Sequence, residues 1–426
     1  MRDETESIAE SILKTNDQGY RRAAMALSVC LASHREGLHD LVAQLWPDDR
    51  ETVSAAVDKV LLAPFVEETS AGWRINSDFA VPFVQHFMEE DQGAFQQAHE
   101  ILASREREAM SELGSAAPDV LEMERWFVQS RLAFYLAGVH ADESVEQFGL
   151  AFESAPQREQ TPARLWLSTL VFRQRPLIGT HIRVIAFFEG FRAYVAGQRS
   201  EALSHLNDVI AGDHEDLYQA IGLHLYAICL YKPSDRIHDL TKSVELSERL
   251  GLSENSIMAR NSLVVAHFAM ANELRRSGQG SLSQRHLRLA ERLSKLNLQQ
   301  ALGTSVRGYQ AYALTEHAAV QWALVAGTDG RGGMTPGAQK LLPVVIGELS
   351  DAISVADSQG MSDTALYIIN QRASKLRDGG RVTEALSELE NAAQRISSFT
   401  DISTFAVLRC RDQRWVSSRF WGRRRG

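Results

Sequence analysis

The chain has 426 residues, 44% of them hydrophobic and 23% charged, and this globular composition excludes a broadly disordered protein. No apolar run approaches the roughly 18 residues that a membrane span needs, and the acidic start MRDETESIAESILK lacks a signal-peptide pattern. The net charge of −9 is uneven, because residues 1–113 hold 21 acidic and 10 basic residues, whereas the last 18 residues hold seven arginines and one aspartate. We therefore expect a cytoplasmic protein with an acidic N-terminal part, a basic tail and no membrane contact.

Residues that carry metal or nucleophilic chemistry are scattered along the chain. The three cysteines, Cys30, Cys229 and Cys410, lie far apart, with no CxxC or CxxH spacing. The 13 histidines form no HxxxH or HExxH pattern, and no GxSxG motif occurs. The sequence therefore predicts free buried thiols, no metal, no cofactor and no enzymatic activity.

Residues 1–21 are expected to form an N-terminal helix or arm, and residues 22–113 a separate module. Apolar spacing predicts three helices, two short strands around the turn residues 69–72, and a further helix. The second helix is expected to begin just after Gly37. The predicted elements cover residues 21–32, 39–46, 50–63, 65–68, 73–76 and 78–90. Three helices followed by a hairpin are typical of a winged helix-turn-helix.

This order of elements resembles the winged-helix segment of bacterial STAND-type signalling ATPases over about 80 residues. In that family the segment leads directly into TPR repeats. The positions that carry the resemblance are Leu61, Leu62, the predicted wing from Phe65 to Asn76, Phe83, His86 and Phe87. The chain has no GxxxxGK[ST] phosphate-binding motif, and the glycine cluster at 327–337 lacks the lysine. The resemblance therefore implies a sensor portion whose NTPase core is missing or lies on another polypeptide.

DNA binding is the usual role of a winged helix, but the charge of this module opposes it. The third helix, which would enter the major groove, has mostly acidic side chains near its start and on its body. They are Asp48, Asp49, Glu51 and Asp58, against Arg50 and Lys59. Because phosphate contacts need positive charge, a packing or protein-docking role is favoured over DNA binding.

Residues 114–408 are expected to form TPR-like helical repeats. The stretches 243–267 and 352–376 align without gaps, and each has an apolar helix, a Gly-Leu/Met-Ser-Glu/Asp turn and a second helix. Their offset of 109 residues indicates three units of about 36, close to the 34-residue TPR period. About 300 residues then hold roughly seven to eight helical pairs in one irregular α-solenoid.

Glycines mark the predicted tight turns between the two helices of a repeat. Gly197, Gly278 and the pair Gly379-Gly380 follow apolar helical runs, and two of these turns precede a Glu-Ala-Leu motif. A glycine is suited to this place because the chain leaves the first helix through a left-handed conformation. The complete TPR consensus is absent. The predicted class is therefore all-α, a TPR-like solenoid behind a winged-helix-like module with one short hairpin.

The basic tail, residues 409–426, is the predicted partner-binding segment. Arginines alternate with aromatic residues in it, a pattern suited to phosphate binding with base stacking or to docking on an acidic protein surface. A third interpretation is that the aromatic side chains cap the last repeat. The candidate residues are Arg411, Arg414, Trp415, Arg419, Phe420, Trp421, Arg423, Arg424 and Arg425.

Two functions fit these predictions. The first is a non-enzymatic sensor or adaptor that binds a protein or peptide ligand through the repeats, with a separate effector subunit as a further partner. The STAND resemblance implies bacterial signalling or phage defence for it. The alternative is a transcriptional regulator with a winged-helix head and a TPR sensing body, for which nucleic acid is the partner.

Overall fold

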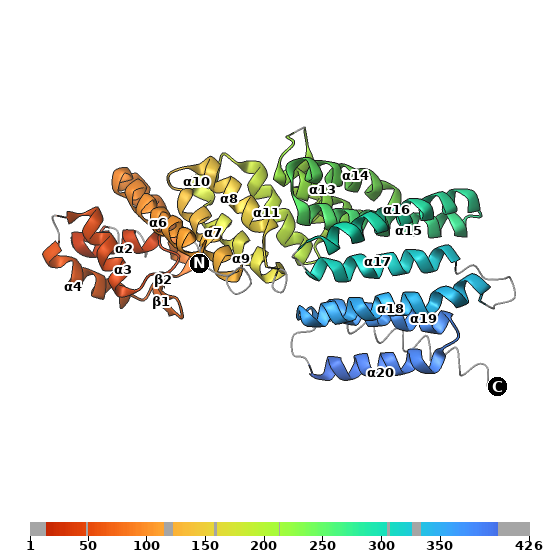
Figure 1. The fold of residues 1–426 in the computed structure, drawn as a ribbon. Coiled ribbons are helices and arrows are strands. Elements are labelled where there is room, and N and C mark those ends of the chain that lie inside the picture. Colours follow the sequence, from red (N-terminus) through yellow and green to blue (C-terminus); the bar gives the residue numbers. More distant parts are fainter. Residues whose placement is uncertain are drawn as a thin grey trace. The chain divides into compact units, whose positions relative to one another are not determined.

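The described part of the chain is all-α apart from one hairpin (Figure 1). The computed structural model describes residues 14–47, 50–114, 122–156, 160–212, 214–304, 307–325 and 334–398. Within these ranges the secondary structure confirms the predicted class, helical repeats with one short hairpin near the N-terminus. Internal contacts divide the chain into two compact units, Met1–Glu201 and Ala202–Gly426. The domain boundaries predicted at residues 22, 114 and 409 stay predictions.

The N-terminal module contains the predicted helices and wing. Its elements are α2 (Gln18–Ser28), α3 (Arg35–Leu45), α4 (Arg50–Leu61), β1 (Val66–Thr69), β2 (Gly72–Ile75) and α5 (Ser77–Glu90). The two strands pair antiparallel, with Val66 opposite Ile75 and Thr69 opposite Gly72. Gly72 has a φ of 114°, which suits a residue without a side chain at the start of β2.

Ser33, between α2 and α3, adds a short third pairing to the wing. Its N–H donates to the Trp73 carbonyl at 2.8 Å, and its carbonyl accepts from the Trp73 N–H at 2.9 Å. This bridge holds the chain extended as far as His34, the residue before α3. The helix therefore begins at Arg35, and the prediction that it starts after Gly37 was wrong.

Aromatic side chains form the core of the module. Phe83 and Phe87, two of the positions that carry the STAND resemblance, are fully buried on α5. Phe83 stacks on Phe65 with the ring centroids 5.1 Å apart, and Phe87 meets Phe95 edge-on at 5.5 Å. The wing and α5 are thus joined through one aromatic cluster.

The rest of the first unit consists of α6 (Gln92–Leu113), α7 (Glu122–Leu136), α8 (Ala141–Glu153), α9 (Gln160–Arg173), the short α10 (Arg175–Ile178) and α11 (Ile182–Val195). Its core is also aromatic. Phe152 on α8 is fully buried and contacts three phenylalanines of α11, with ring centroids 4.9 to 5.8 Å apart. The three are Phe187, Phe188 and Phe191. Helix α12 (Arg199–Ile210) spans the division between the units.

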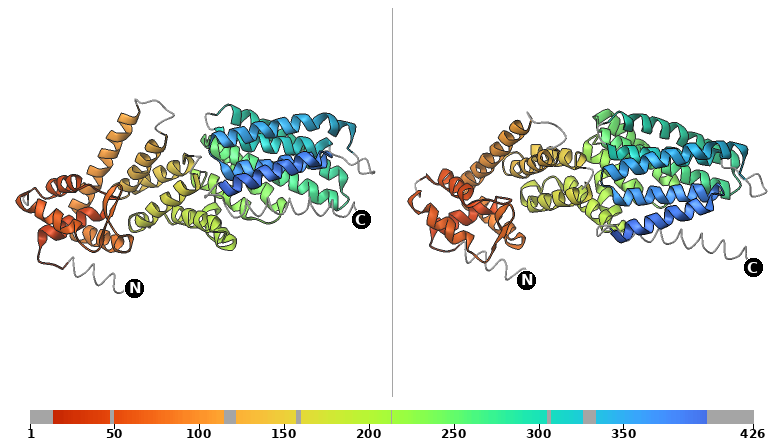
Figure 2. Two further views of the ribbon diagram at one scale, coloured as in Figure 1. Left: turned by 90° about the horizontal axis from the view of Figure 1, so that it is seen from below. Right: turned by 60° about the horizontal axis from the view of Figure 1, so that its bottom comes forward.

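The second unit continues with α13 (Leu217–Cys229), α14 (Pro233–Leu250), α15 (Ser253–Arg276), α16 (Gly280–Leu302), α17 (Arg307–Val325), α18 (Pro336–Ser358), α19 (Ser362–Asp378) and α20 (Val382–Ser398). Each helix packs against the next, and Figure 2 shows them side by side. In the second unit the helices α13 to α20 form four helical pairs, and the predicted total of seven to eight pairs stays a prediction.

The repeat length differs from the predicted 36 residues in the later part of the chain. The first helices of successive pairs begin at 182, 217, 253, 307 and 362, so the intervals are 35, 36, 54 and 55 residues. The two aligned stretches are α14–α15 and α18–α19, separated by two long pairs and not by three short ones. The aligned turns do match, since Gly251 and Gly360 both adopt positive φ, 72° and 67°. Helices α15 to α18 have 19 to 24 residues each, and this accounts for the longer period.

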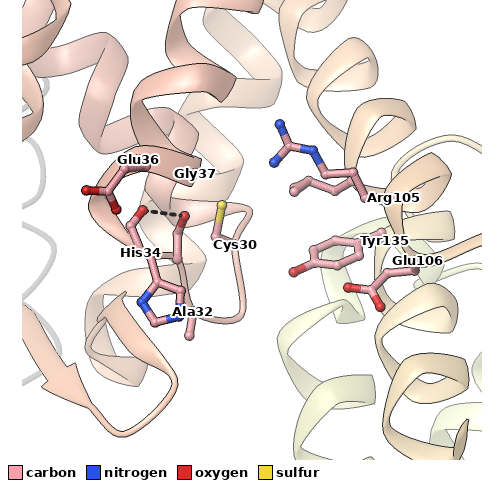
Figure 3. Close-up of a pocket in the computed structure, with 10 residues that line it drawn as sticks. Cys30, Ala32, His34, Glu36, Gly37, Arg105, Glu106 and Tyr135 are labelled. Carbon is pink, nitrogen blue, oxygen red and sulfur yellow. Dashed lines mark hydrogen bonds between the residues drawn. The ribbon is translucent and has the colours of Figure 1, made fainter. Parts of the chain in front are cut away.

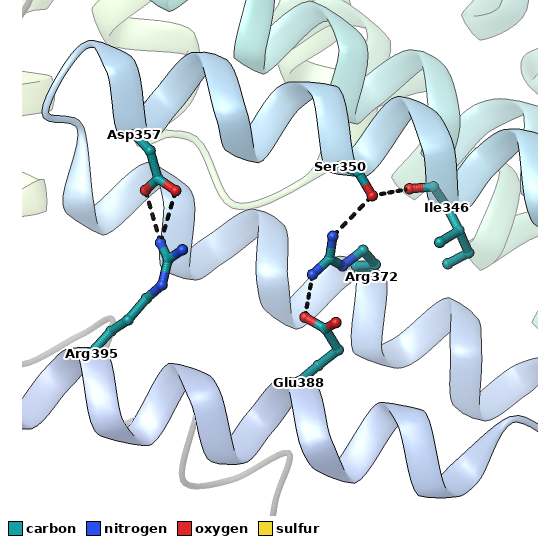
Figure 4. A network of polar contacts seen from close by, with 6 residues as sticks. All are labelled: Ile346, Ser350, Asp357, Arg372, Glu388 and Arg395. Atoms are coloured by element: carbon teal, nitrogen blue, oxygen red, sulfur yellow. Dashed lines mark hydrogen bonds and ion pairs between the residues drawn. The ribbon is translucent and has the colours of Figure 1, made fainter.

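Ion pairs hold the last three helices together (Figure 4). Arg372 of α19 donates to Ser350 of α18 at 2.9 Å and pairs with Glu388 of α20. Arg395 of α20 donates to both carboxylate oxygens of Asp357 on α18, at 2.8 and 3.1 Å. The guanidinium groups thus fix α20 in register with the two helices before it.

Acid should destabilise the protein through its buried histidines. Burial lowers the pKa of His99, on α6, to about 4, although its Nδ1 lies 2.8 Å from the Tyr135 carbonyl. An unfolded histidine has a pKa near 6.5, so the folded state binds fewer protons between those values, and its stability falls as the pH drops from about 6.5 to about 4.

Between pH 6.5 and pH 5 we expect His99 to contribute a loss of about 2 kcal/mol in the free energy of unfolding. Urea titrations at a series of pH values measure it. The slope should weaken in His99→Gln and persist in His238→Gln, which changes an exposed histidine. An unchanged slope in His99→Gln would contradict this account.

Candidate functional site

In the second unit, the first helix of each pair contacts the first helix of the next pair. We call α13, α15, α17 and α19 the A helices; α13 contacts α15, α15 contacts α17, and α17 contacts α19. A layer of helical pairs curves toward the side on which successive helices lie closer, which gives repeat proteins their concave binding face. The A helices therefore provide the candidate binding surface.

The contact between α13 and α15 is polar. His224 of α13 has its Nδ1 3.2 Å from Asn255 Oδ1 and its Nε2 3.0 Å from Ser262 Oγ. The Asn255 amide donates to Ser247 of α14 at 2.8 Å, which orients Oδ1 as the acceptor for His224. The Nδ1 of His224 therefore carries the proton, and its Nε2 accepts from Ser262.

Ser262, His224 and Asn255 are hydrogen-bonded in the same order as the serine, histidine and amide of a catalytic triad. Ser262, however, lies in the middle of α15, where the backbone N–H groups are used within the helix. A serine nucleophile also needs nearby N–H donors for the developing oxyanion. We interpret the network as a structural link between α13, α14 and α15.

Tyrosine hydroxyls make further polar contacts between A helices. Tyr309 of α17 donates to Glu254 of α15 at 2.8 Å. Tyr312 of α17 lies 2.8 Å from Thr364 Oγ1 of α19, and Tyr367 of α19 donates to Glu316 of α17 at 3.4 Å. Burial raises the pKa of Tyr312, so this phenol stays protonated at neutral pH.

Several side chains of the same helices are only partly buried or are exposed, and we call this set the A-helix surface. Its members are Ser262, Val265, Tyr312, Glu316, Tyr367 and Lys375. Tyr367 and Lys375 are eight residues apart on α19, and Tyr312 and Glu316 are four apart on α17, so each pair lies on one helix face. Burial lowers the pKa of Lys375, and the carboxylates of Asp378 and Glu316 partly offset this effect. The surface offers hydroxyl, carboxylate and ammonium groups beside apolar ones.

A buried arginine connects α15 to the helices before and after it. Arg260 of α15 is 2% exposed and pairs with Glu248 of α14 and Gln300 of α16. A buried cation is costly unless it is paired, so these contacts hold the two neighbouring helices to α15. The sequence around Arg260 mixes apolar and polar residues, so it carries no signal that this arginine is buried.

No metal or membrane site was found in the parts of the chain that the structure describes. In those parts, no three His, Cys, Asp or Glu side chains lie together as metal ligands would, and no helix is long and apolar enough to cross a membrane. The predicted partner-binding tail, Arg411, Arg414, Trp415, Arg419, Phe420, Trp421 and Arg423 to Arg425, lies outside the described residues.

The fold and these contacts define a helical-repeat protein with a winged-helix-like N-terminal module. No family model matches the chain, and a comparison with curated proteins found no match.

Replacing Asn255 should weaken the second unit. Asn255→Ala leaves His224 and Ser247 without their buried partner, and we expect a loss of about 2–3 kcal/mol in the free energy of unfolding. Asn207→Ala on α12, where the side chain is exposed, is the matched control and should change stability by less than about 0.5 kcal/mol. Chemical denaturation followed by circular dichroism measures both. Equal shifts for the two variants would show that the network does not hold the A helices together.

Proposed function

We propose that this protein is a non-enzymatic sensor or adaptor that binds a protein or peptide ligand on the A-helix surface. The observation that carries the proposal is the row of partly exposed tyrosine, carboxylate and ammonium groups on adjacent A helices. Such groups match the alternating N–H and C=O groups of a peptide, and the tyrosine rings supply apolar area.

The winged-helix-like module would then pass the binding event to a separate effector subunit. The resemblance to the winged-helix and TPR portion of STAND-type proteins supports this role and a place in bacterial signalling or phage defence. In this proposal the module docks on protein, and the repeats select the ligand.

Ion pairing on α4 argues against the alternative, a DNA-binding regulator. Lys59 is already paired with Asp17 at 2.6 Å, and the exposed Asp58 binds Arg35 at 2.5 Å. Leu62, directly after the helix, is 87% exposed. A paired lysine, a carboxylate and an apolar side chain suit a protein surface better than a phosphate backbone.

The proposal is tested with peptides selected by display against the full chain. Tyr367→Ala should weaken their binding about tenfold, because it removes an aromatic anchor from the surface. Arg288→Ala, on the second helix of its pair, is the control and should leave affinity unchanged. Fluorescence anisotropy measures both. Equal affinities for the two variants would place the ligand elsewhere.

Binding to DNA separates the two functions. We expect no binding of labelled duplex DNA to the full chain at about 150 mM salt, because the module is acidic and its α4 lysine is paired. A salt-dependent affinity that Lys59→Gln weakens would favour the regulator.

A further inference from the structure

A cavity of about 490 Å³ lies in the first unit, between the start of α3 and the helices α6 and α7 (Figure 3). The residues that line it include Cys30, His34, Glu36, Arg105, Glu106 and Tyr135. This volume is in the range of ligand pockets. The site is independent of the A-helix surface, because all of its residues belong to the first unit.

One buried hydroxyl in the cavity has an unused proton. Tyr135 is 4% exposed, and Figure 3 shows its hydroxyl pointing into the space between α7 and the start of α3. The hydroxyl oxygen accepts weakly from the Leu31 N–H at 3.4 Å. Its hydrogen has no acceptor among the described residues. Burial raises the pKa of this phenol, so the group remains a donor at neutral pH.

A cation and a helix start complete the set of donors. Arg105 of α6 forms no ion pair or hydrogen bond with another residue that the structure describes, and Figure 3 shows its guanidinium directed toward the same space. On the opposite wall α3 begins without a side-chain cap, since the His34 side chain makes no capping hydrogen bond. The first N–H groups of a helix are unsatisfied and favour negative charge.

The acidic residues at the cavity form no hydrogen bond with these donors. Glu106 pairs with Arg131 through Oε1 at 2.9 Å, and its buried Oε2 has no hydrogen-bond partner among the described residues. Figure 3 shows the Glu36 carboxylate directed away from the cavity. Cys30 is not a nucleophile here, because burial raises the pKa of its thiol to about 12. One cation beside one neutral donor matches one carboxylate group of a ligand better than a doubly charged phosphate.

We propose that this cavity binds a carboxylate, held by the Arg105 guanidinium and the Tyr135 hydroxyl at the start of α3. Both a small organic acid and the C-terminus of a peptide carry this group. Because the cavity joins the N-terminal module to the first repeat helices, its occupant would stabilise their contact. The inference does not depend on ligand binding by the A-helix surface.

The test uses saturation-transfer NMR on the full chain with succinate, N-acetyl-leucine, a free-acid tripeptide, the primary amides of all three, and inorganic phosphate. We expect the carboxylates to bind and their amides to bind at least tenfold more weakly. Binding of the tripeptide acid alone identifies a peptide end as the ligand, and binding of succinate identifies a small acid. Either outcome supports the carboxylate site.

Two variants locate the binding. Arg105→Gln changes an exposed residue, and Tyr135→Phe keeps the aromatic ring. Each variant should weaken carboxylate binding at least tenfold. Arg107→Gln is the control, since this cation of α6 pairs with Glu143 and does not line the cavity. The proposal is overturned if no carboxylate saturates the protein, if phosphate binds more tightly, or if Arg105→Gln binds like Arg107→Gln.

Discussion

Contact between successive A helices is the constraint on which the second unit depends. A single helical pair exposes its apolar face, so each pair needs its neighbours for burial. Apolar clusters supply most of that burial, for example around Val345 and Ile368, both fully buried. The polar contacts of His224, Tyr309 and Tyr312 then fix how each A helix is rotated, because a hydrogen bond is directional where apolar packing is not.

The same contacts connect stability to the proposed function. Groups that link two A helices, such as Glu316 and Tyr367, are also partly exposed. A peptide that hydrogen bonds to them would bridge neighbouring repeats and favour one spacing of the helices. Ligand binding would thereby be coupled to the geometry of the repeat layer, which is the property that a sensor needs.

Much of the fold could be predicted from the sequence because it depends on local patterns. Apolar spacing located the helices of the N-terminal module, and Gly197, Gly278 and Gly380 adopt the left-handed conformation predicted for their turns. The 36-residue period was wrong for the later repeats, because identical turns do not reveal how long the helices between them are. The bridge from Ser33 to Trp73 and the link from His224 to Ser262 join residues 38 to 40 positions apart, and neither has a local signature. The one binding segment predicted from composition, the basic tail, lies outside the described residues.

Hydrogen–deuterium exchange of the full chain with a selected peptide tests the central claim most directly. The account predicts that bound peptide slows exchange in α13, α15, α17 and α19, with much smaller effects in α14, α16, α18 and α20. Protection confined to the second helices of the pairs, or to the N-terminal module, would contradict the assignment of the A helices as the ligand-binding surface.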